Sequence, residues 1–174
     1  MPPKRQPFIK ALAAAFALSA AGPALTSTAE ARLDPTLARH ALQYTSPIED
    51  ILGIPEFEDK VIKADKLVFV VFYTEESMAS MLFKSTLRKF ARNNSDKYIF
   101  AKVNAKDNPD ITRACHITRV PTVIAIAKGG YEAGRIEGAV GMQDLVDFTI
   151  NAEIHAKLFE AMQKVKGQSK HPKP

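Results

Sequence analysis

Side chains suited to covalent chemistry are few in this chain, and their spacing restricts what they can do. The 174 residues include one cysteine, Cys115, and two serines, Ser77 and Ser80, that stand three positions apart shortly after an apolar run. A serine hydroxyl is too weak an acid to act as a nucleophile without a neighbouring base. No histidine lies near the two serines in sequence, so nucleophilic catalysis by this pair is not predicted.

Cys115 cannot form a disulfide within the chain, because there is no second cysteine to pair with it. Free cysteine is among the most buried residue types, which favours a small apolar core residue at this position. The alternative is a reactive thiol that forms a mixed disulfide with another molecule. That alternative needs an exposed sulfur with a lowered pKa.

The sequence contains no pattern typical of a metal site or a phosphate loop. The four histidines are His40, His116, His155 and His171. None of them stands at a metal-site spacing from cysteine, aspartate or glutamate. Gly129-Gly130 is typical of a hairpin turn, because no Lys-Ser/Thr pair follows it as in a phosphate loop. We therefore predict no metal and no cofactor.

The first 31 residues have the three-part layout of a secretory signal peptide. A basic start is followed by an apolar run at 11–21 and by the small-residue sequence Ala29-Glu30-Ala31. The run is shorter than the roughly 20 apolar residues that span a bilayer, which disfavours an uncleaved anchor. We expect cleavage after Ala31 and a periplasmic or secreted bacterial protein without a stable membrane anchor.

The net charge of +5 is mild, and residues 1–31 contribute three basic residues against one acidic residue. The remainder therefore carries +3, mostly as basic residues interspersed with acidic ones. The exception is the C-terminal tail, which contains Lys164, Lys166, Lys170 and Lys173. Such a tail is also typical of contacts with anionic lipid or nucleic acid, but we interpret it as a solvated, disordered end. For an exported protein we predict no nucleic-acid partner.

Hydrophobic periodicity predicts an α/β domain. The apolar run at 66–73 is typical of a strand buried on both faces. Residues 98–104 are predicted to form a second buried strand and residues 122–127 a third strand. The first two are joined by a helix, which predicts a parallel pair with a right-handed crossover. Gly129-Gly130 predicts an antiparallel hairpin between the third strand and a strand at 131–137.

The expected helices span about 36–43, 55–64, 77–93 and 108–114, and a long helix starts at Met142. Ser77 or Ser80 is the expected N-cap of the helix at 77–93. The apolar side of this helix is predicted to hold Met78, Met81, Leu82, Leu87 and Phe90. Its basic residues, assigned to the solvated side, are Lys84, Arg88, Lys89 and Arg92.

This order of elements, together with several local sequences, resembles the thioredoxin family over about residues 55–155. The local sequences that carry the resemblance are the strand at 68–73, Ala101-Lys102-Val103-Asn104, Asn108-Pro109, Ile117-Thr118-Arg119-Val120-Pro121-Thr122, Lys128-Gly129-Gly130 and Gly138. The resemblance implies a thioredoxin-like fold with a central mixed sheet of four to five strands flanked by helices. The sequence adds an extended C-terminal helix.

Four segments make up the expected domain organisation. They are a signal peptide at 1–31, a lead-in at 32–54, the thioredoxin-like domain at 55–155, and a helix extension with a disordered basic tail at 156–174.

The chain departs from the family at the residues that carry redox chemistry. Redox-active members begin the helix after the central strand with Cys-x-x-Cys, in which one thiolate attacks and the other thiol resolves the mixed disulfide. Ser77 and Ser80 align with those two cysteines, Val71 aligns with the family's buried acid, and Glu76 replaces the flanking tryptophan. The resemblance thus implies a redox-inactive member that is not a classical disulfide oxidoreductase.

The binding architecture of the family is retained. The resemblance implies a cis bond between Val120 and Pro121, which exposes a backbone that pairs with an extended partner segment. The alternative for this proline is that the fold itself requires the bend. The expected binding residues are Ser77, Met78, Ala79, Val120, Pro121 and Thr122. We predict that the protein is a binding or chaperone-like module whose partner is a protein or an extended polypeptide.

The sequence leaves two other functions open. One is thiol–disulfide or peroxide chemistry through Cys115 alone. The other is a structural subunit of an envelope complex, in which the helix beyond about residue 150 docks a partner or a second copy. The apolar residues of this stretch are Ile154, Leu158, Phe159, Met162 and Val165. Folding back onto the domain would also cover them, and the oligomeric state is left open.

Overall fold

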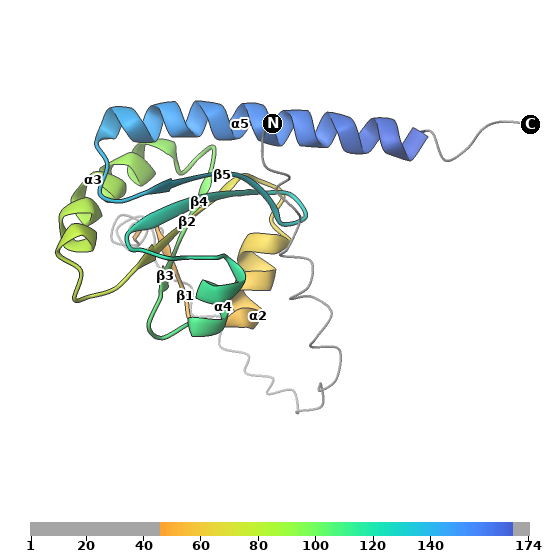
Figure 1. Cartoon of the computed structure of the whole chain (residues 1–174). Helices are drawn as coiled ribbons and strands as arrows, with labels where there is room; N and C mark the ends of the chain where they lie inside the picture. The colour runs from red at the N-terminus through yellow and green to blue at the C-terminus, as the bar shows by residue number, and fades with distance from the viewer. Residues whose placement is uncertain (1–45, 169–174) are drawn as a thin grey trace, which may run out of the picture.

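The computed structural model describes residues 46–168, with side chains up to Lys166. The predicted signal peptide, the predicted helix at 36–43 and the end of the basic tail lie outside the described residues. Figure 1 shows a central sheet with helices on both sides. The elements in chain order are β1 (Glu49–Ile51), α2 (Ile54–Phe57), the π-helical turn η2 (Glu58–Ile62), β2 (Val68–Tyr73), α3 (Met78–Asn94), β3 (Ile99–Asn104), α4 (Pro109–Ala114), β4 (Thr122–Ala127), β5 (Tyr131–Glu137) and α5 (Met142–Gln168).

The strands form one mixed sheet of five strands in the order β1-β3-β2-β4-β5. β1, β3 and β2 run parallel, whereas β4 is antiparallel to both β2 and β5. The helix α3 connects β2 to β3, as expected for a parallel pair. A tight turn at Gly129 and Gly130, with φ angles of 75° and 76°, joins β4 to β5. The predicted mixed α/β sheet and its hairpin are confirmed.

Alternation of side chains along the strands divides the core into two layers, one on each face of the sheet. On β2, Phe69 and Val71 belong to the layer covered by α3 and α5. Val68, Val70 and Phe72 belong to the layer covered by α2, η2 and α4. Because β2 is central and apolar on both faces, both layers depend on it.

Two local features differ from the sequence-based prediction. The strand β1 lies within the expected lead-in and pairs with β3, Glu49 opposite Ala101. Its three residues are too few to show a period, so only the pairing defines it. The helix expected at 55–64 begins at Ile54 and becomes π-helical at Glu58, whose C=O accepts the N–H of Lys63 at 3.0 Å.

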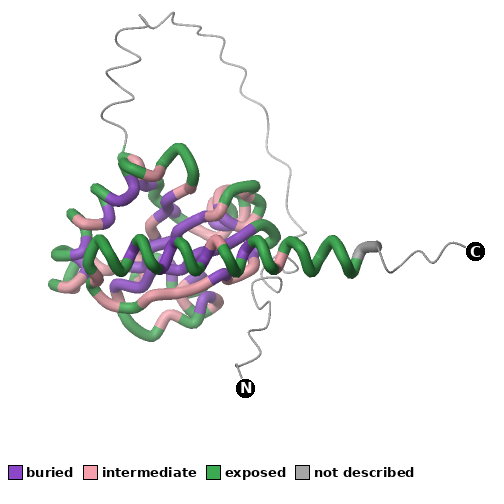
Figure 2. Tube along the Cα trace, turned by 90° about the horizontal axis from the view of Figure 1, so that it is seen from above, coloured by how far each residue is buried: buried purple, intermediate pink, exposed green. Residues whose placement is uncertain are grey.

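The long helix predicted from Met142 is α5, which continues beyond the edge of the sheet (Figure 1). Its inner side is buried as far as Ala156, and the Phe159 ring stacks on Tyr131 at a centroid distance of 3.9 Å. Figure 2 shows the outer side as exposed along the helix. Apolar residues on this exposed side are Val146, Ile150, Ile154, Leu158, Met162 and Val165. We call these six residues the α5 stripe.

Folding back therefore covers Phe159 but leaves the rest of the C-terminal apolar residues exposed.

Within residues 46–168, no helix combines the length and the apolar character needed to cross a membrane.

Candidate functional site

The candidate site begins where β2 ends and α3 starts. A short turn after Tyr73 leads to Ser77, which is the N-cap residue of α3. The Ser77 hydroxyl accepts a hydrogen bond from the N–H of Ser80 at 3.2 Å, which satisfies one of the free donors at the helix start. Of the two serines that the sequence offered as caps, Ser77 fills the role.

The proline segment lies at the same edge of the sheet as this helix start. Phe72 of β2 pairs with Thr122 of β4, so the end of one strand meets the beginning of the other. Pro121, just before β4, lines the same cavity as Ser80. The bond between Val120 and Pro121 is cis, as the resemblance implied. The structure thus brings together the two segments from which the sequence predicted a binding surface.

Hydrogen bonds hold the proline segment in place, but none of those within the described residues involves the backbone N–H or C=O of Val120. The N–H of Gly138 donates to the C=O of Pro121 at 2.7 Å, and the Thr122 hydroxyl donates to the C=O of Arg119 at 2.8 Å. Within residues 46–168, neither the N–H nor the C=O of Val120 forms a hydrogen bond. An unpaired backbone at the end of a sheet can pair with an extended peptide.

Arg135 on β5 anchors the loop that leads into the proline segment. Its guanidinium donates to the C=O of Cys115 at 3.1 Å and to the C=O of His116 at 3.3 Å. It also donates to both carboxylate oxygens of Glu132, each at 2.7 Å, and this pairing raises the pKa of Arg135. Sequence reasoning missed this role, because the arginine and Cys115 lie 20 positions apart.

Replacing Arg135 by leucine is expected to lower the free energy of unfolding by about 2 kcal/mol, because two carbonyls and a carboxylate lose charge-assisted hydrogen bonds. Solvent limits the loss, since the side chains of Arg135 and Glu132 are each 23% exposed. Urea unfolding measures the difference. The matched control is Arg113→Leu, because Arg113 is 78% exposed and pairs with Asp110 of its own helix. An equal loss in both variants would contradict the anchoring role.

The start of α3 exposes a group of apolar side chains. Met78 is 66% exposed, Met81 50% and Leu82 68%, so the predicted apolar side of α3 is buried only at Leu87 and Phe90. Phe83, which the prediction omitted, is the buried aromatic residue near the helix start. We call Met78, Met81 and Leu82 the helix-start surface. It extends the predicted binding residues with two side chains that sequence reasoning had assigned to the core.

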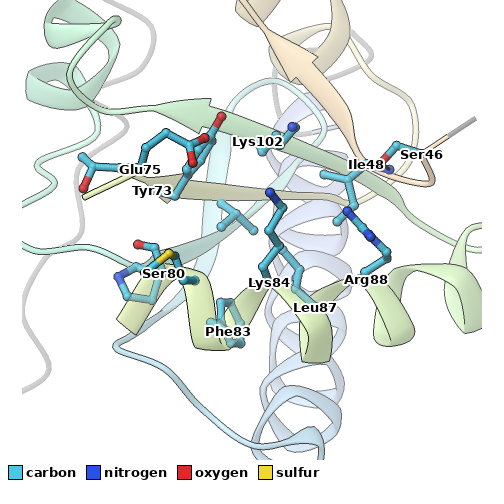
Figure 3. Close-up of a pocket in the computed structure, with 14 residues that line it drawn as sticks. Ser46, Ile48, Tyr73, Glu75, Ser80, Phe83, Lys84, Leu87, Arg88 and Lys102 are labelled. Atoms are coloured by element: carbon cyan, nitrogen blue, oxygen red, sulfur yellow. Dashed lines mark hydrogen bonds between the residues drawn. The ribbon is translucent and has the colours of Figure 1, made fainter. Parts of the chain in front are cut away.

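A cavity of about 300 Å³ lies behind the helix start, between α3 and the sheet (Figure 3). Its apolar walls are formed by Ile48, Val71, Met81, Phe83, Leu87 and Pro121. Three cations also line it, Lys84 and Arg88 from α3 and Lys102 from β3. Sequence reasoning had left the two α3 cations on the solvated side. Their spacing was the available signal, because Ser80, Lys84 and Arg88 recur every four residues along one helix face.

Cys115 lies on the other face of the sheet from α3. The residue is 3% exposed and packs in the core layer beneath α2 and α4, so the sheet separates it from Ser77 and Ser80. Burial raises the pKa of its thiol to about 12, with a further raising effect from Glu132 and a lowering effect from Arg135. The prediction of a small buried residue at this position is confirmed.

The native Cys115 thiol is expected to react with an aromatic disulfide reagent about a thousandfold more slowly than the same thiol in urea-unfolded protein. The reason is that a pKa raised from 9.0 to about 12 lowers the thiolate fraction by that factor. Because the folded pKa exceeds the unfolded one, the free energy of unfolding should also fall as the pH rises from 9.0 through about 12, and less so in Cys115→Ala. Rapid reaction of the native thiol would contradict this prediction and would support thiol–disulfide or peroxide chemistry through Cys115.

One further pair of side chains lies next to the start of α3. The carboxylate of Glu76, just before α3, accepts a hydrogen bond from Lys106, and this bond lowers the pKa of Glu76. In the part of the chain that the structure describes, no three His, Cys, Asp or Glu side chains are grouped so that they could hold a metal ion.

The mixed sheet between two helical layers, with a helix start and a cis-proline segment at one edge, defines a protein with the thioredoxin fold. The family model described as Thioredoxin matches residues 51–151, which is more than half of the chain. The chain belongs to the thioredoxin family.

Individual relatives agree with this assignment. Mitochondrial thioredoxin of Rattus norvegicus is 26% identical over 110 residues, which cover 63% of this chain and 64% of the rat protein. Thioredoxin of Chlorobaculum thiosulfatiphilum is 30% identical over 84 residues, which cover 48% of this chain and 77% of that protein. The chain spans less than two thirds of the rat relative, and 52% of mitochondrial thioredoxin from Mus musculus.

Solved structures support the fold. Oxidized mitochondrial thioredoxin 3 of Saccharomyces cerevisiae superposes with a TM-score of 0.53 at 23% identity, over 60% of this chain and 98% of the yeast chain. Malassezia sympodialis thioredoxin gives a TM-score of 0.55 at 21% identity, over 60% of this chain and 90% of that chain. The predicted thioredoxin-like fold is confirmed.

Proposed function

We propose that this protein is a polypeptide-binding member of the thioredoxin family that does not carry out dithiol chemistry. One observation carries the proposal: serines stand at the start of α3, while the sole cysteine is buried on the opposite face of the sheet. Thiol–disulfide exchange by a thioredoxin needs an attacking and a resolving thiol. The relatives are named thioredoxins, which favours redox activity in those proteins, but this chain does not have the second thiol.

The partner that the site favours is an extended segment with apolar side chains. The unpaired backbone of Val120 supplies a donor and an acceptor for one added strand. The helix-start surface supplies two methionines and a leucine, and methionine adapts its shape to different partners. Ser77 and Ala79, which are half-buried, complete the surface. The sequence-based prediction also included Thr122, but its side chain is 1% exposed and its hydroxyl donates to the C=O of Arg119, so it does not contribute to the surface.

Photo-cross-linking tests this proposal. A benzophenone amino acid at position 78 is expected to cross-link a polypeptide in the cell from which the protein comes, and mass spectrometry should locate one short segment in that partner. Met78→Asp and Leu82→Asp should abolish binding of the identified segment, because a charge then meets an apolar side chain. Met162→Asp is the matched control, since this methionine is 56% exposed but lies on α5.

Two outcomes would contradict the proposal. One is an equal yield of adducts from a benzophenone at Lys89, an exposed position farther along α3. The other is a partner whose affinity is unchanged by Met78→Asp and Leu82→Asp.

We also propose export, on the basis of residues 1–31. Several relatives are named mitochondrial thioredoxins. The Ala-rich apolar run and the absence of an Arg-rich amphipathic pattern favour a secretory signal over a mitochondrial one. Mass spectrometry of the protein from fractionated cells should find Arg32 at the N-terminus, and retention of residues 1–31 would contradict cleavage.

The α5 stripe favours a second candidate function, a subunit of a larger assembly. Six apolar side chains exposed in one row are unusual on a helix that has nothing to contact. Ile154→Glu and Leu158→Glu are expected to abolish any association seen in sedimentation measurements, and Lys157→Glu is the control. A wild-type protein that sediments as a monomer in the presence of the cross-linked partner would exclude this function.

A further inference from the structure

The cavity behind the helix start combines apolar walls with positive charge. The side chains of Val71, Phe83 and Leu87 are nearly fully buried and form its inner wall. Its volume of about 300 Å³ lies at the lower end of the range for small-molecule sites. A compact ligand fits such a space, whereas a dinucleotide or another large cofactor does not.

Three cations surround this space. Figure 3 shows Lys84 and Arg88 rising from α3 toward β3, the strand that carries Lys102. Lys102 forms an ion pair with Asp50 at 2.9 Å. Within residues 46–166, neither the side chain of Lys84 nor that of Arg88 has an ion pair or a hydrogen bond. Glu75, which is exposed, is the only carboxylate among the lining residues, so positive charge is in excess.

Ser80 supplies an independent indication of a ligand. The residue is 8% exposed, and its hydroxyl oxygen is buried without a hydrogen-bond partner in the described part of the chain. Leaving a buried polar group unsatisfied costs roughly 1–3 kcal/mol. Ser80 lines the cavity, so a polar atom that enters there gains a donor that the protein itself does not use.

We propose that this cavity binds a compact organic carboxylate with an aliphatic or aromatic body. The carboxylate lies between Lys84 and Arg88, whose side chains have no partner among the described residues. The body of the ligand contacts the apolar side chains of Val71 and Leu87. A strongly hydrated phosphate ester has no apolar body to place against them, so it fits the cavity less well. Met81 and Pro121 belong both to this cavity and to the proposed polypeptide-binding surface. The inference does not depend on the polypeptide-binding proposal, because it rests on Lys84, Arg88 and the inner wall, which are not part of that surface.

Calorimetry with matched ligands tests the chemistry. Octanoate and naphthoate are expected to bind the full-length protein, whereas octanamide, which has the same body without the charge, should bind at least about tenfold more weakly. Added salt should weaken octanoate and leave octanamide unchanged. No binding of either carboxylate, or equal binding of octanoate and octanamide, would overturn the proposal.

Variants on α3 test the location. Lys84→Gln and Arg88→Gln are each expected to weaken octanoate about tenfold through loss of a charge-assisted contact. Lys89→Gln and Arg92→Gln are the matched controls, because these exposed residues of the same helix do not line the cavity. All four positions are exposed, so melting temperatures should stay close to that of the wild type. Equal effects at all four positions would indicate non-specific charge attraction and would overturn the site.

Methyl NMR spectra separate the cavity from the other apolar surface of the protein. Octanoate should shift the methyl resonances of Val71 and Leu87. Shifts confined to Leu158 and Val165 would place the ligand on the α5 stripe and would also overturn the proposal. An acidic polypeptide that displaces octanoate and binds more tightly would identify a different class of ligand.

Discussion

The double variant Ser77→Cys/Ser80→Cys is expected to gain an internal disulfide and a disulfide reductase activity above that of the natural chain. Ser77 is the N-cap residue of α3, and its hydroxyl lies 3.2 Å from the N–H of Ser80. A thiol at a helix N-terminus loses its proton more easily, and in thioredoxin its pKa is about 7. The buried position of Ser80 suits a resolving thiol that is shielded from other reagents.

The activity of this variant should be lower than that of a natural thioredoxin by about a hundredfold, because Val71 stands where the family has a buried acid that moves protons. Insulin reduction measures the activity, and alkylation followed by mass spectrometry counts the thiols. Ser77→Cys/Ser85→Cys is the control, because eight residues of helix separate these positions by about 12 Å, too far for a disulfide. Insulin reduction by the natural chain would contradict the proposed function.

The variant Phe69→Ala is expected to lose about 4 kcal/mol of the free energy of unfolding, the typical cost of emptying a large buried aromatic site. Phe69 is 2% exposed and is the second residue of β2. Its ring centroid lies 5.3 Å from that of Tyr98, 5.5 Å from Phe100 and 5.8 Å from Phe148. One side chain therefore links β2, β3 and α5, and its removal weakens all three contacts at once.

Urea unfolding followed by circular dichroism measures this loss. Phe69→Leu should cost about 1 kcal/mol, because most of the volume is kept. Leu158→Ala on the α5 stripe is the exposed control and should change stability by less than about 0.5 kcal/mol. A loss below about 1 kcal/mol in Phe69→Ala would mean that the layer under α5 is not the main source of stability.

The sequence predicted the architecture well for those elements whose conformation depends on their own residues. Apolar runs specified β2 and β4, because strands buried on both faces have no polar alternation to interrupt them. The largely apolar segment at 98–104 also specified β3, although its Lys102 and Asn104 are only half-buried. Gly129-Gly130 specified the hairpin, since only glycine adopts both positive φ angles without strain. Prediction failed for β1, whose three residues are defined by pairing with β3.

The same division holds for the candidate site. Sequence order placed Ser77 and Ser80 at a helix start, and the lone cysteine ruled out an internal disulfide. It did not show that Met81 and Leu82 face solvent, because periodicity identifies an apolar side without showing what covers it. The same ambiguity in α5 left open whether its C-terminal apolar residues fold back onto the domain or stay exposed.

By itself, the sequence determined the order of the elements, the serines at positions 77 and 80 and the single cysteine, because these depend on residue identity alone. Only the tertiary structure decided that Cys115 lies across the sheet from Ser77, that Arg135 holds the loop before Pro121, and that Lys84 and Lys102 line one cavity. These relations join residues distant in the chain, and they arise when α3 packs against the sheet in which β5 is an edge strand. Packing, rather than local pattern, converts a helix start with two serines into a surface with a cavity behind it.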